Sequence, residues 1–192
     1  KIIRLPVQSK NPLLIIFNTI ILFFLIIILN INIVHARSRA PAWSCYLSCL
    51  LTGRKFVTTF HGTYSISGRF KKIYNSVMLK SKLTIAGSNF IFNHINENYK
   101  DYINPKNKLM VIFRGINVDY YNPKNISEFK KNKLISEWKL KEENFNILLP
   151  GRLTSWKGQE KFIEALNILS VDYNKTNFHG VILGDDQGRN VY

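Results

Sequence analysis

The chain has little cysteine and little alanine, and its first half has no acidic residue. Two cysteines among 192 residues exclude a disulfide-rich secreted scaffold. A hydrophobic content of 46% and an aromatic content of 13% exclude a disordered tail, and the sequence has no Gly-X-Y or heptad repeat that would indicate a fibre. A chain of this length can bury a core and suits between one and two domains.

The charge is unevenly distributed along the chain. Residues 1–96 hold twelve Lys and Arg and no Asp or Glu, whereas residues 97–192 hold fifteen basic and all twelve acidic residues. The two halves therefore carry +12 and +3 of the net +15. A positive lobe attracts an anionic membrane surface, nucleic acid or a phosphorylated substrate. No carboxylate of residues 1–96 can act as a general base, nucleophile or metal ligand.

Residues 13–29 form an apolar run in which 15 of 17 residues are apolar. As a helix the run would be about 25 Å long, shorter than a hydrocarbon core of about 30 Å. Asn11-Pro12 is typical of a helix start, and Asn30 interrupts the run at its end. We therefore expect a buried helix here. A single membrane span, or a helix lying on the membrane, remains the alternative.

Strand and helix patterns alternate along the rest of the chain, which predicts an α/β fold with a parallel sheet covered by helices. The expected strands are 31–35, 54–60, 83–86, 109–113, 145–149 and 178–183. The expected helices are 42–52, 89–99 and 159–170, with helical stretches in the basic segment 69–82. The two cysteines, Cys45 and Cys49, are expected to be small buried residues of the first of these helices.

Candidate binding groups follow the ends of four expected strands. Ligands of parallel sheets lie at the carboxyl ends of the strands, so these groups are candidates for one site. They are Arg37 with Arg39, His61 with Gly62, Arg114 with Gly115, and Gly151 with Arg152.

The loop 150–158 leaves a strand and enters a helix. Gly151 allows a tight turn, the helix start offers free N–H groups to an anion, and Arg152 and Lys157 could face the same phosphates. The loop is not a Walker loop, and the chain has no GxGxxG fingerprint. On its own, this pattern fits a plain surface turn equally well.

Several motifs in order resemble glycosyltransferase family 4, whose members are retaining enzymes of the GT-B fold. PGRLTSWKGQEKFIEAL resembles the start of the family's donor-binding region, and VILGDDQGR resembles the Gly-Asp loop that follows it. IVHARSRAPAW, FVTTFHGTY, IAGSNFIFNHI and FRGINVDYYNP resemble elements of the acceptor lobe, although Asn117 replaces the family's usual Asp.

This resemblance implies a GT-B-like fold with two Rossmann-like lobes. Residues 1–122 would form the acceptor lobe, incomplete at its start, and 123–144 the crossing between lobes. Residues 145–192 would form the beginning of the nucleotide-sugar-binding lobe. The family's glycine-rich first loop and its paired glutamates are absent, so we expect an internal fragment with little or no turnover.

The resemblance also assigns roles to residues. His61 would be the catalytic residue beside the transferred sugar, with Gly62 close to that sugar, and Gly151, Arg152 and Lys157 would bind the donor diphosphate. We further expect Arg37 and Arg39 to bind an anionic acceptor, and Arg114 with Gly115 to serve the substrate or a hinge. The nucleotide-sugar would be a co-substrate, and we expect neither cofactor nor metal.

The implied function is transfer of a hexose-type sugar, with retention of configuration, to a lipid-linked or cell-surface glycan. Lipopolysaccharide biosynthesis in a bacterium is the kind of pathway it suggests. The enzyme would be cytoplasmic and peripheral at the inner face of the membrane. The alternative is a non-catalytic basic membrane-binding module anchored by residues 13–29. Nucleic-acid binding has no support, because the chain has no aromatic-basic stacking motif.

Overall fold

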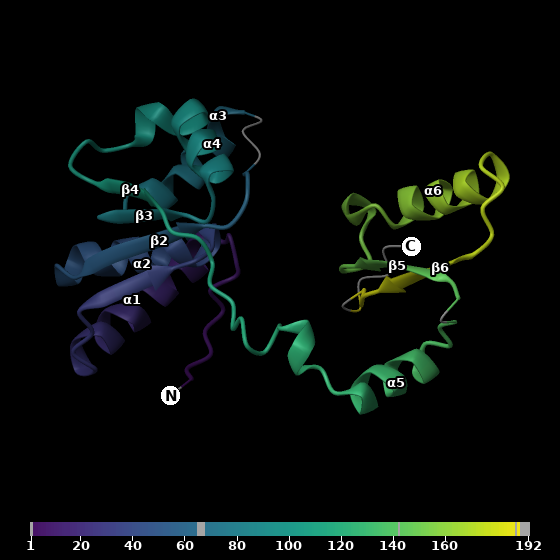
Figure 1. Ribbon diagram of the computed structural model, residues 1–192. Coiled ribbons are helices and arrows are strands. Elements are labelled where there is room, and N and C mark those ends of the chain that lie inside the picture. Colours follow the sequence, from purple (N-terminus) through teal and green to yellow (C-terminus); the bar gives the residue numbers. More distant parts are fainter. Residues whose placement is uncertain (1, 65–67, 142, 187, 189–192) are drawn as a thin grey trace. The chain divides into compact units, whose positions relative to one another are not determined.

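The protein is described by a computed structural model covering residues 2–64, 68–141, 143–186 and 188 (Figure 1). The chain divides into two compact units, Lys1–Gly115 and Ile116–Tyr192, and each is described by itself. The division falls near the expected end of the acceptor lobe at residue 122. The lobe boundaries proposed from the sequence stay predictions.

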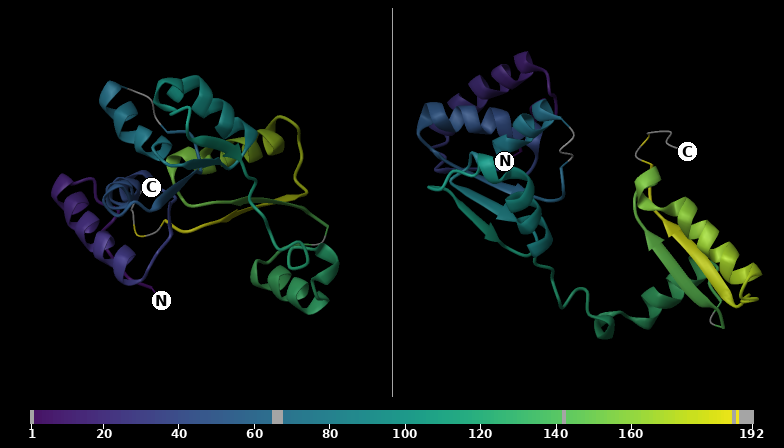
Figure 2. Two further views of the ribbon diagram at one scale, coloured as in Figure 1. Left: turned by 90° about the vertical axis from the view of Figure 1, so that its left-hand side faces the viewer. Right: turned by 90° about the horizontal axis from the view of Figure 1, so that it is seen from above.

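The first unit is built on a four-stranded parallel sheet of order β1-β2-β3-β4, seen from three directions in Figures 1 and 2. The expected α/β architecture is therefore confirmed. The strands are β1 (Ile33–Ala36), β2 (Lys55–Phe60), β3 (Leu83–Ala86) and β4 (Lys108–Val111). The helices are α1 (Pro12–Ile28), α2 (Arg39–Thr52), α3 (Arg69–Asn75) and α4 (Asn89–Tyr99), with short 3₁₀ turns at Ser76–Leu79 and Lys100–Tyr102.

Helix α1 begins and ends where the sequence predicts. The Asn11 side chain accepts a hydrogen bond from the Leu13 amide at 2.9 Å, and Pro12 occupies the first helical position. The helix stops at Ile28, and Asn30 takes a left-handed conformation with φ 47°. Within the described part of the chain, no helix has the length and apolarity needed to cross a bilayer.

The expectation that this helix would be buried is only half met. Helix α1 packs beside α2, and Ile26 joins the core, but one side of α1 is exposed. Figure 1 shows the two helices side by side. The core itself lies between the sheet and its helices, where its largest fully buried side chains are Tyr99, Phe60, Ile26, Met78, Ile95 and Val77.

A cluster of buried hydroxyl groups joins β2 to β3. Thr58 and Thr84 both donate to the carbonyl oxygen of Met78, and Ser81 lies 2.9 Å from each of their hydroxyls. All three hydroxyl side chains are at most 2% exposed. Their polar atoms are paired with one another and with the backbone, which removes most of the free-energy penalty of burying them.

The bounds of several elements differ from the sequence expectation, and two of these differences decide where candidate residues lie. Helix α2 begins at Arg39 rather than at residue 42, because Pro41 is tolerated in a first turn whose amides need no partner within the helix. Strand β4 ends at Val111 rather than at residue 113, although the Ile112 amide still bonds the Ala86 carbonyl at 3.0 Å. Arg114 therefore lies on a loop beyond the strand.

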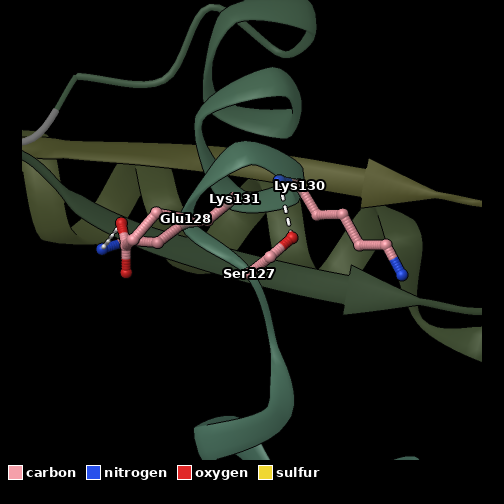
Figure 3. A network of polar contacts seen from close by, with 4 residues as sticks. All are labelled: Ser127, Glu128, Lys130 and Lys131. Atoms are coloured by element: carbon pink, nitrogen blue, oxygen red, sulfur yellow. Dashed lines mark hydrogen bonds and ion pairs between the residues drawn. The ribbon is translucent and has the colours of Figure 1, made fainter.

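The second unit is a parallel pair of strands, β5 (Phe145–Pro150) and β6 (Phe178–Leu183), joined by α6 (Gln159–Val171). A 3₁₀ turn at Ser155–Lys157 precedes α6, and a further turn at Pro123–Asn125 precedes α5 (Glu128–Glu137). Ser127 caps α5 by accepting from the Lys130 amide, and Glu128 pairs with Lys131 at 3.5 Å (Figure 3). Such exposed ion pairs contribute little to stability.

Candidate functional site

Three basic side chains meet at the carboxyl ends of strands of the first unit. The His61 ring, directly after β2, lies between Arg37, directly after β1, and Arg114, beyond β4. Arg37 Nε donates to His61 Nε2 at 3.0 Å, and Arg114 Nη2 lies 2.7 Å from His61 Nδ1. The structure thus joins Arg114, whose role the sequence left open, to Arg37 and His61. We call these three residues the Arg-His-Arg cluster.

The cluster has more donors than one imidazole can satisfy. A neutral imidazole accepts a hydrogen bond at one ring nitrogen and carries a proton on the other, whereas a guanidinium only donates. Both ring nitrogens of His61 face a guanidinium, so one of the two contacts places a donor against a donor. An anion between the three side chains would accept from all of them, and this makes the cluster a candidate anion site.

Its surroundings lower the pKa of His61 below the usual 6.5. Burial contributes most, followed by the positive charges of Arg114 and Arg37 and then by His35. The pKa of His35, whose Nε2 lies 2.8 Å from the Thr59 hydroxyl, is lowered as well, by burial and then by Arg37. Both imidazoles are therefore neutral near pH 7.

These lowered pKa values should make the first unit less stable in weak acid. Below pH 6.5 the unfolded chain takes up protons that the folded unit binds less tightly, so stability falls as the pH is lowered. We expect the melting temperature of the chain to fall between about pH 7.5 and about pH 5.5, and to fall less in the His61→Gln variant. Calorimetry at the two pH values measures both. If the melting temperature falls equally in wild type and variant, the lowered pKa of His61 is not a cause of the pH dependence.

Arg39 is engaged in packing rather than in the Arg-His-Arg cluster. Its Nη1 donates to the Asn75 side chain at 2.9 Å, and its guanidinium lies 4.3 Å from the centre of the Tyr64 ring. Asn75 is fully buried and donates to the Tyr99 hydroxyl at 2.9 Å. These contacts tie the start of α2 to the end of α3. The acceptor role expected for Arg39 stays a prediction.

Gly62 and Gly115 lie in open surroundings. A Cβ added at either position would meet no heavy atom within 4 Å. Their expected roles, close approach of the sugar at Gly62 and a hinge or substrate contact at Gly115, therefore stay predictions.

The loop between β5 and α6 is held by its own backbone and two buried side chains. The Gly151 amide donates to the Leu183 carbonyl at 2.8 Å and the Leu153 amide to that of Asp185 at 3.2 Å. Gln159 Nε2 donates to the Arg152 carbonyl at 2.9 Å, and both Gln159 and Thr154 are at most 5% exposed. The sequence reasoning did not single out these two residues, although both belong to the string that carries the family resemblance.

The predicted phosphate-binding residues share this loop. The aliphatic stem of Lys157 lies over Gly151, since a Cβ added to Gly151 would be 3.7 Å from Lys157 Cδ. Gly158 takes a left-handed conformation with φ 80° directly before α6, and its carbonyl accepts a hydrogen bond from the Phe162 amide at 2.8 Å. The loop thus presents Arg152, Lys157 and a helix start together. A shared diphosphate contact stays a prediction.

Gly184, just after β6, packs directly against this loop. A Cβ at Gly184 would overlap the carbonyl oxygen of Gly151, so only glycine allows the two backbones to approach this closely. The Gly184-Asp185 motif, which follows the neighbouring strand, therefore supports the loop. This supporting role could not be recognised from the sequence.

The chain is similar to known proteins in sequence and in fold. The sequence profile of Glycosyltransferase Family 4 matches residues 2–120. The crystal structure of a glycosyltransferase from Rickettsia africae ESF-5 is similar to the chain, with 36% identity and a TM-score of 0.71 over 96% of this chain and 55% of that one. No curated protein matches the chain.

Two structures of Anabaena Alr3699/HepE, in complex with UDP and with UDP-glucose, are 17% identical and show the same fold. Their TM-scores are 0.68 and 0.71, over 90% and 94% of this chain and 43% and 47% of theirs. The chain thus spans about half the length of the solved structures that it matches.

The fold is that of the GT-B glycosyltransferases. The chain belongs to Glycosyltransferase Family 4.

Proposed function

We propose that the chain is part of an enzyme that transfers a hexose-type sugar from a uridine nucleotide-sugar to an anionic lipid-linked or cell-surface glycan, with retention of configuration. The observation that carries the proposal is the loop after β5, where Arg152, Lys157 and the start of α6 lie together. Cytoplasmic chemistry at the inner face of a bacterial membrane, as in lipopolysaccharide synthesis, is part of the same proposal.

The donor proposal follows from the charge that develops during transfer. As the bond to the sugar breaks, negative charge grows on the diphosphate that leaves, so fixed cations beside it stabilise the transition state more than the ground state. Arg152 would contribute a forked contact and Lys157 a point charge, while the first amides of α6 add N–H donors. These groups would replace a divalent metal, so we propose transfer without one.

His61 would act on the sugar as a neutral hydrogen-bonding group. Its lowered pKa keeps the ring uncharged near pH 7, so it can donate to or accept from a sugar hydroxyl. Gly62, with open space around its Cα, would let the sugar approach the backbone.

The acceptor proposal rests on the Arg-His-Arg cluster. Two guanidiniums against one imidazole leave a donor unsatisfied, and a phosphate or carboxylate of the acceptor would accept from both arginines and from His61. The absence of acidic residues from 1–96 leaves no carboxylate of that segment to compete for the position.

Inorganic phosphate is expected to raise the pKa of His61, because an anion beside the ring favours the imidazolium. In the Arg37→Gln/Arg114→Gln variant the pKa should start higher, since two nearby positive charges are gone, and phosphate should move it little. Titration of the His61 ring signals by NMR, with and without phosphate, measures both. A phosphate effect that is equal in wild type and variant would contradict the acceptor site.

The proposed function is tested by titrating UDP-glucose into the chain in a calorimeter. We expect saturable binding that UDP competes away, because UDP retains the diphosphate that the loop would hold. Absence of binding to UDP and UDP-glucose alike would overturn the donor proposal.

A further inference from the structure

Arg39, the first residue of α2, makes two contacts at once. Its Nη1 donates to the Asn75 side chain at 2.9 Å, and its Cζ lies 4.3 Å from the centre of the Tyr64 ring. A planar guanidinium can donate from its edge while its face lies on an aromatic ring. Arg39 therefore connects the segment that follows β2 to the end of α3.

The Asn75 side of this connection is attached to the core of the first unit. Asn75 is the last residue of α3 and is fully buried, and its side-chain amide donates to the Tyr99 hydroxyl at 2.9 Å. Tyr99, the last residue of α4, is fully buried as well. The Asn75 amide thus has a partner for its oxygen and for its nitrogen, which removes most of the penalty of burying it. Arg39 is fixed to this buried pair.

The Tyr64 side of the connection holds the segment that carries His61. The Tyr64 ring lies 4.9 Å from the ring of Phe60, which is fully buried and is the last residue of β2. Residues 61–64 form neither helix nor strand, so the sheet does not hold them. His61 therefore lies between two anchored rings, that of Phe60 in the sheet and that of Tyr64 on the guanidinium of Arg39.

We propose that Arg39 is a positioning residue, which holds His61 in place through Tyr64 rather than contacting the acceptor itself. The inference rests on the proposed function, in which His61 acts on the sugar and takes part in the acceptor site. For that role the His61 ring must stay between Arg37 and Arg114, at 3.0 and 2.7 Å. A misplacement of about 1 Å can lower a catalytic rate by about a hundredfold.

The proposed effect of Arg39 is geometric and not one of charge. The pKa of His61 is lowered by burial first, and then by the two arginines of the Arg-His-Arg cluster and by His35. Loss of the Arg39 contact should therefore reach this pKa by moving the ring away from those groups. Less burial and more distant positive charges both favour the imidazolium, so the pKa would rise toward the usual 6.5.

The test is titration of the His61 ring signals by NMR in the full chain. In Tyr64→Leu, which removes the ring but no charge, we expect the pKa of His61 to rise toward 6.5, because the segment has lost its second anchor. Arg39→Gln should raise it as well. Tyr64→Phe keeps the aromatic ring, so His61 should titrate in it as in the wild type.

A matched control breaks a different bond between the same two helices. Trp43, one turn after Arg39 on α2, donates from Nε1 to the Tyr74 carbonyl of α3 at 3.1 Å. Trp43→Phe removes this bond but leaves the Tyr64 contact, so the pKa of His61 should not change. Circular dichroism checks that each variant is folded, and if Arg39→Gln does not fold, Tyr64→Leu decides.

Three results would overturn the positioning proposal. They are a wild-type titration of His61 in Tyr64→Leu or in folded Arg39→Gln, an equal rise of the pKa in Trp43→Phe, and an equal rise in Tyr64→Phe and Tyr64→Leu. The second result would mean that Arg39 only ties α2 to α3. The titration with UDP-glucose reports on the loop after β5 instead. Absence of nucleotide binding would reject the donor site alone, and an unchanged His61 would reject the positioning role alone.

Discussion

Replacing Arg152 and Lys157 together by glutamine is expected to lower the affinity for UDP-glucose by about a hundredfold or more. Hydrogen bonds to charged groups contribute about 1.5–3 kcal/mol each, and about 1.4 kcal/mol corresponds to a factor of ten. Losing two such bonds to one diphosphate therefore costs more binding free energy than losing any single contact of the loop. Calorimetric titration of wild type and variant measures the ratio.

The control for this prediction is the Lys131→Gln/Lys133→Gln variant of α5. It removes the same charge from the same unit, but on an exposed helix, where Lys131 pairs with Glu128 (Figure 3) and Lys133 pairs with Glu137. Its affinity should stay within about twofold of wild type, since exposed ion pairs contribute little. If both double variants lose affinity equally, the effect is one of overall charge and the loop is not the diphosphate site.

Gly184→Ala is expected to destabilise the second unit by about 3 kcal/mol or more. The new Cβ would overlap the Gly151 carbonyl oxygen, and a backbone atom held between β5 and its loop has little freedom to withdraw. Urea unfolding followed by the fluorescence of Trp138 and Trp156, which both belong to this unit, measures the loss. Binding of UDP-glucose should fall in parallel, because the displaced backbone carries Arg152.

Two other glycines allow comparison with the loss of stability expected for Gly184→Ala. At Gly180 a Cβ would overlap Leu166 Cδ1, the end of a flexible side chain that can turn away, so Gly180→Ala should cost less than Gly184→Ala. At Gly115 a Cβ would meet nothing within 4 Å, so Gly115→Ala should leave stability nearly unchanged. A Gly184→Ala variant as stable as Gly115→Ala would show that the two backbones are not in contact.

Much of the fold could be predicted because local signals and the parallel topology agreed. The alternation of strands and helices predicts the sheet, and Asn11-Pro12 and Asn30 mark the ends of α1. The orientation of that helix could not be predicted. With apolar residues on nearly every side, periodicity does not select an inner face, and the usual rule would turn Asn18 outward, whereas the structure buries it.

The sequence predicts at which edge of the sheet the site residues lie, but not which of their side chains contact one another. Strand ends placed Arg37, His61 and Arg114 at one edge of the sheet, and the structure joins them. The same reasoning could not separate Arg39 from Arg37, because Arg39 is the first residue of α2, and its bond to Asn75 depends on residues 36 positions away. Thr154 and Gln159 were missed since their contacts are to the loop's own backbone.

The buried hydroxyl cluster around the Met78 carbonyl fixes the register of β2 as well as its packing against β3. Successive residues of a strand point to opposite faces of its sheet, so a shift of β2 by one position would carry His61 away from Arg37 and Arg114. A one-position shift that brings Val57 to the place of Thr58 would also leave the Ser81 hydroxyl and the Met78 carbonyl without this hydroxyl partner in the interior. The buried hydroxyls of Thr58, Ser81 and Thr84 thereby hold β2 in the register that places His61, three positions beyond Thr58, beside the two arginines.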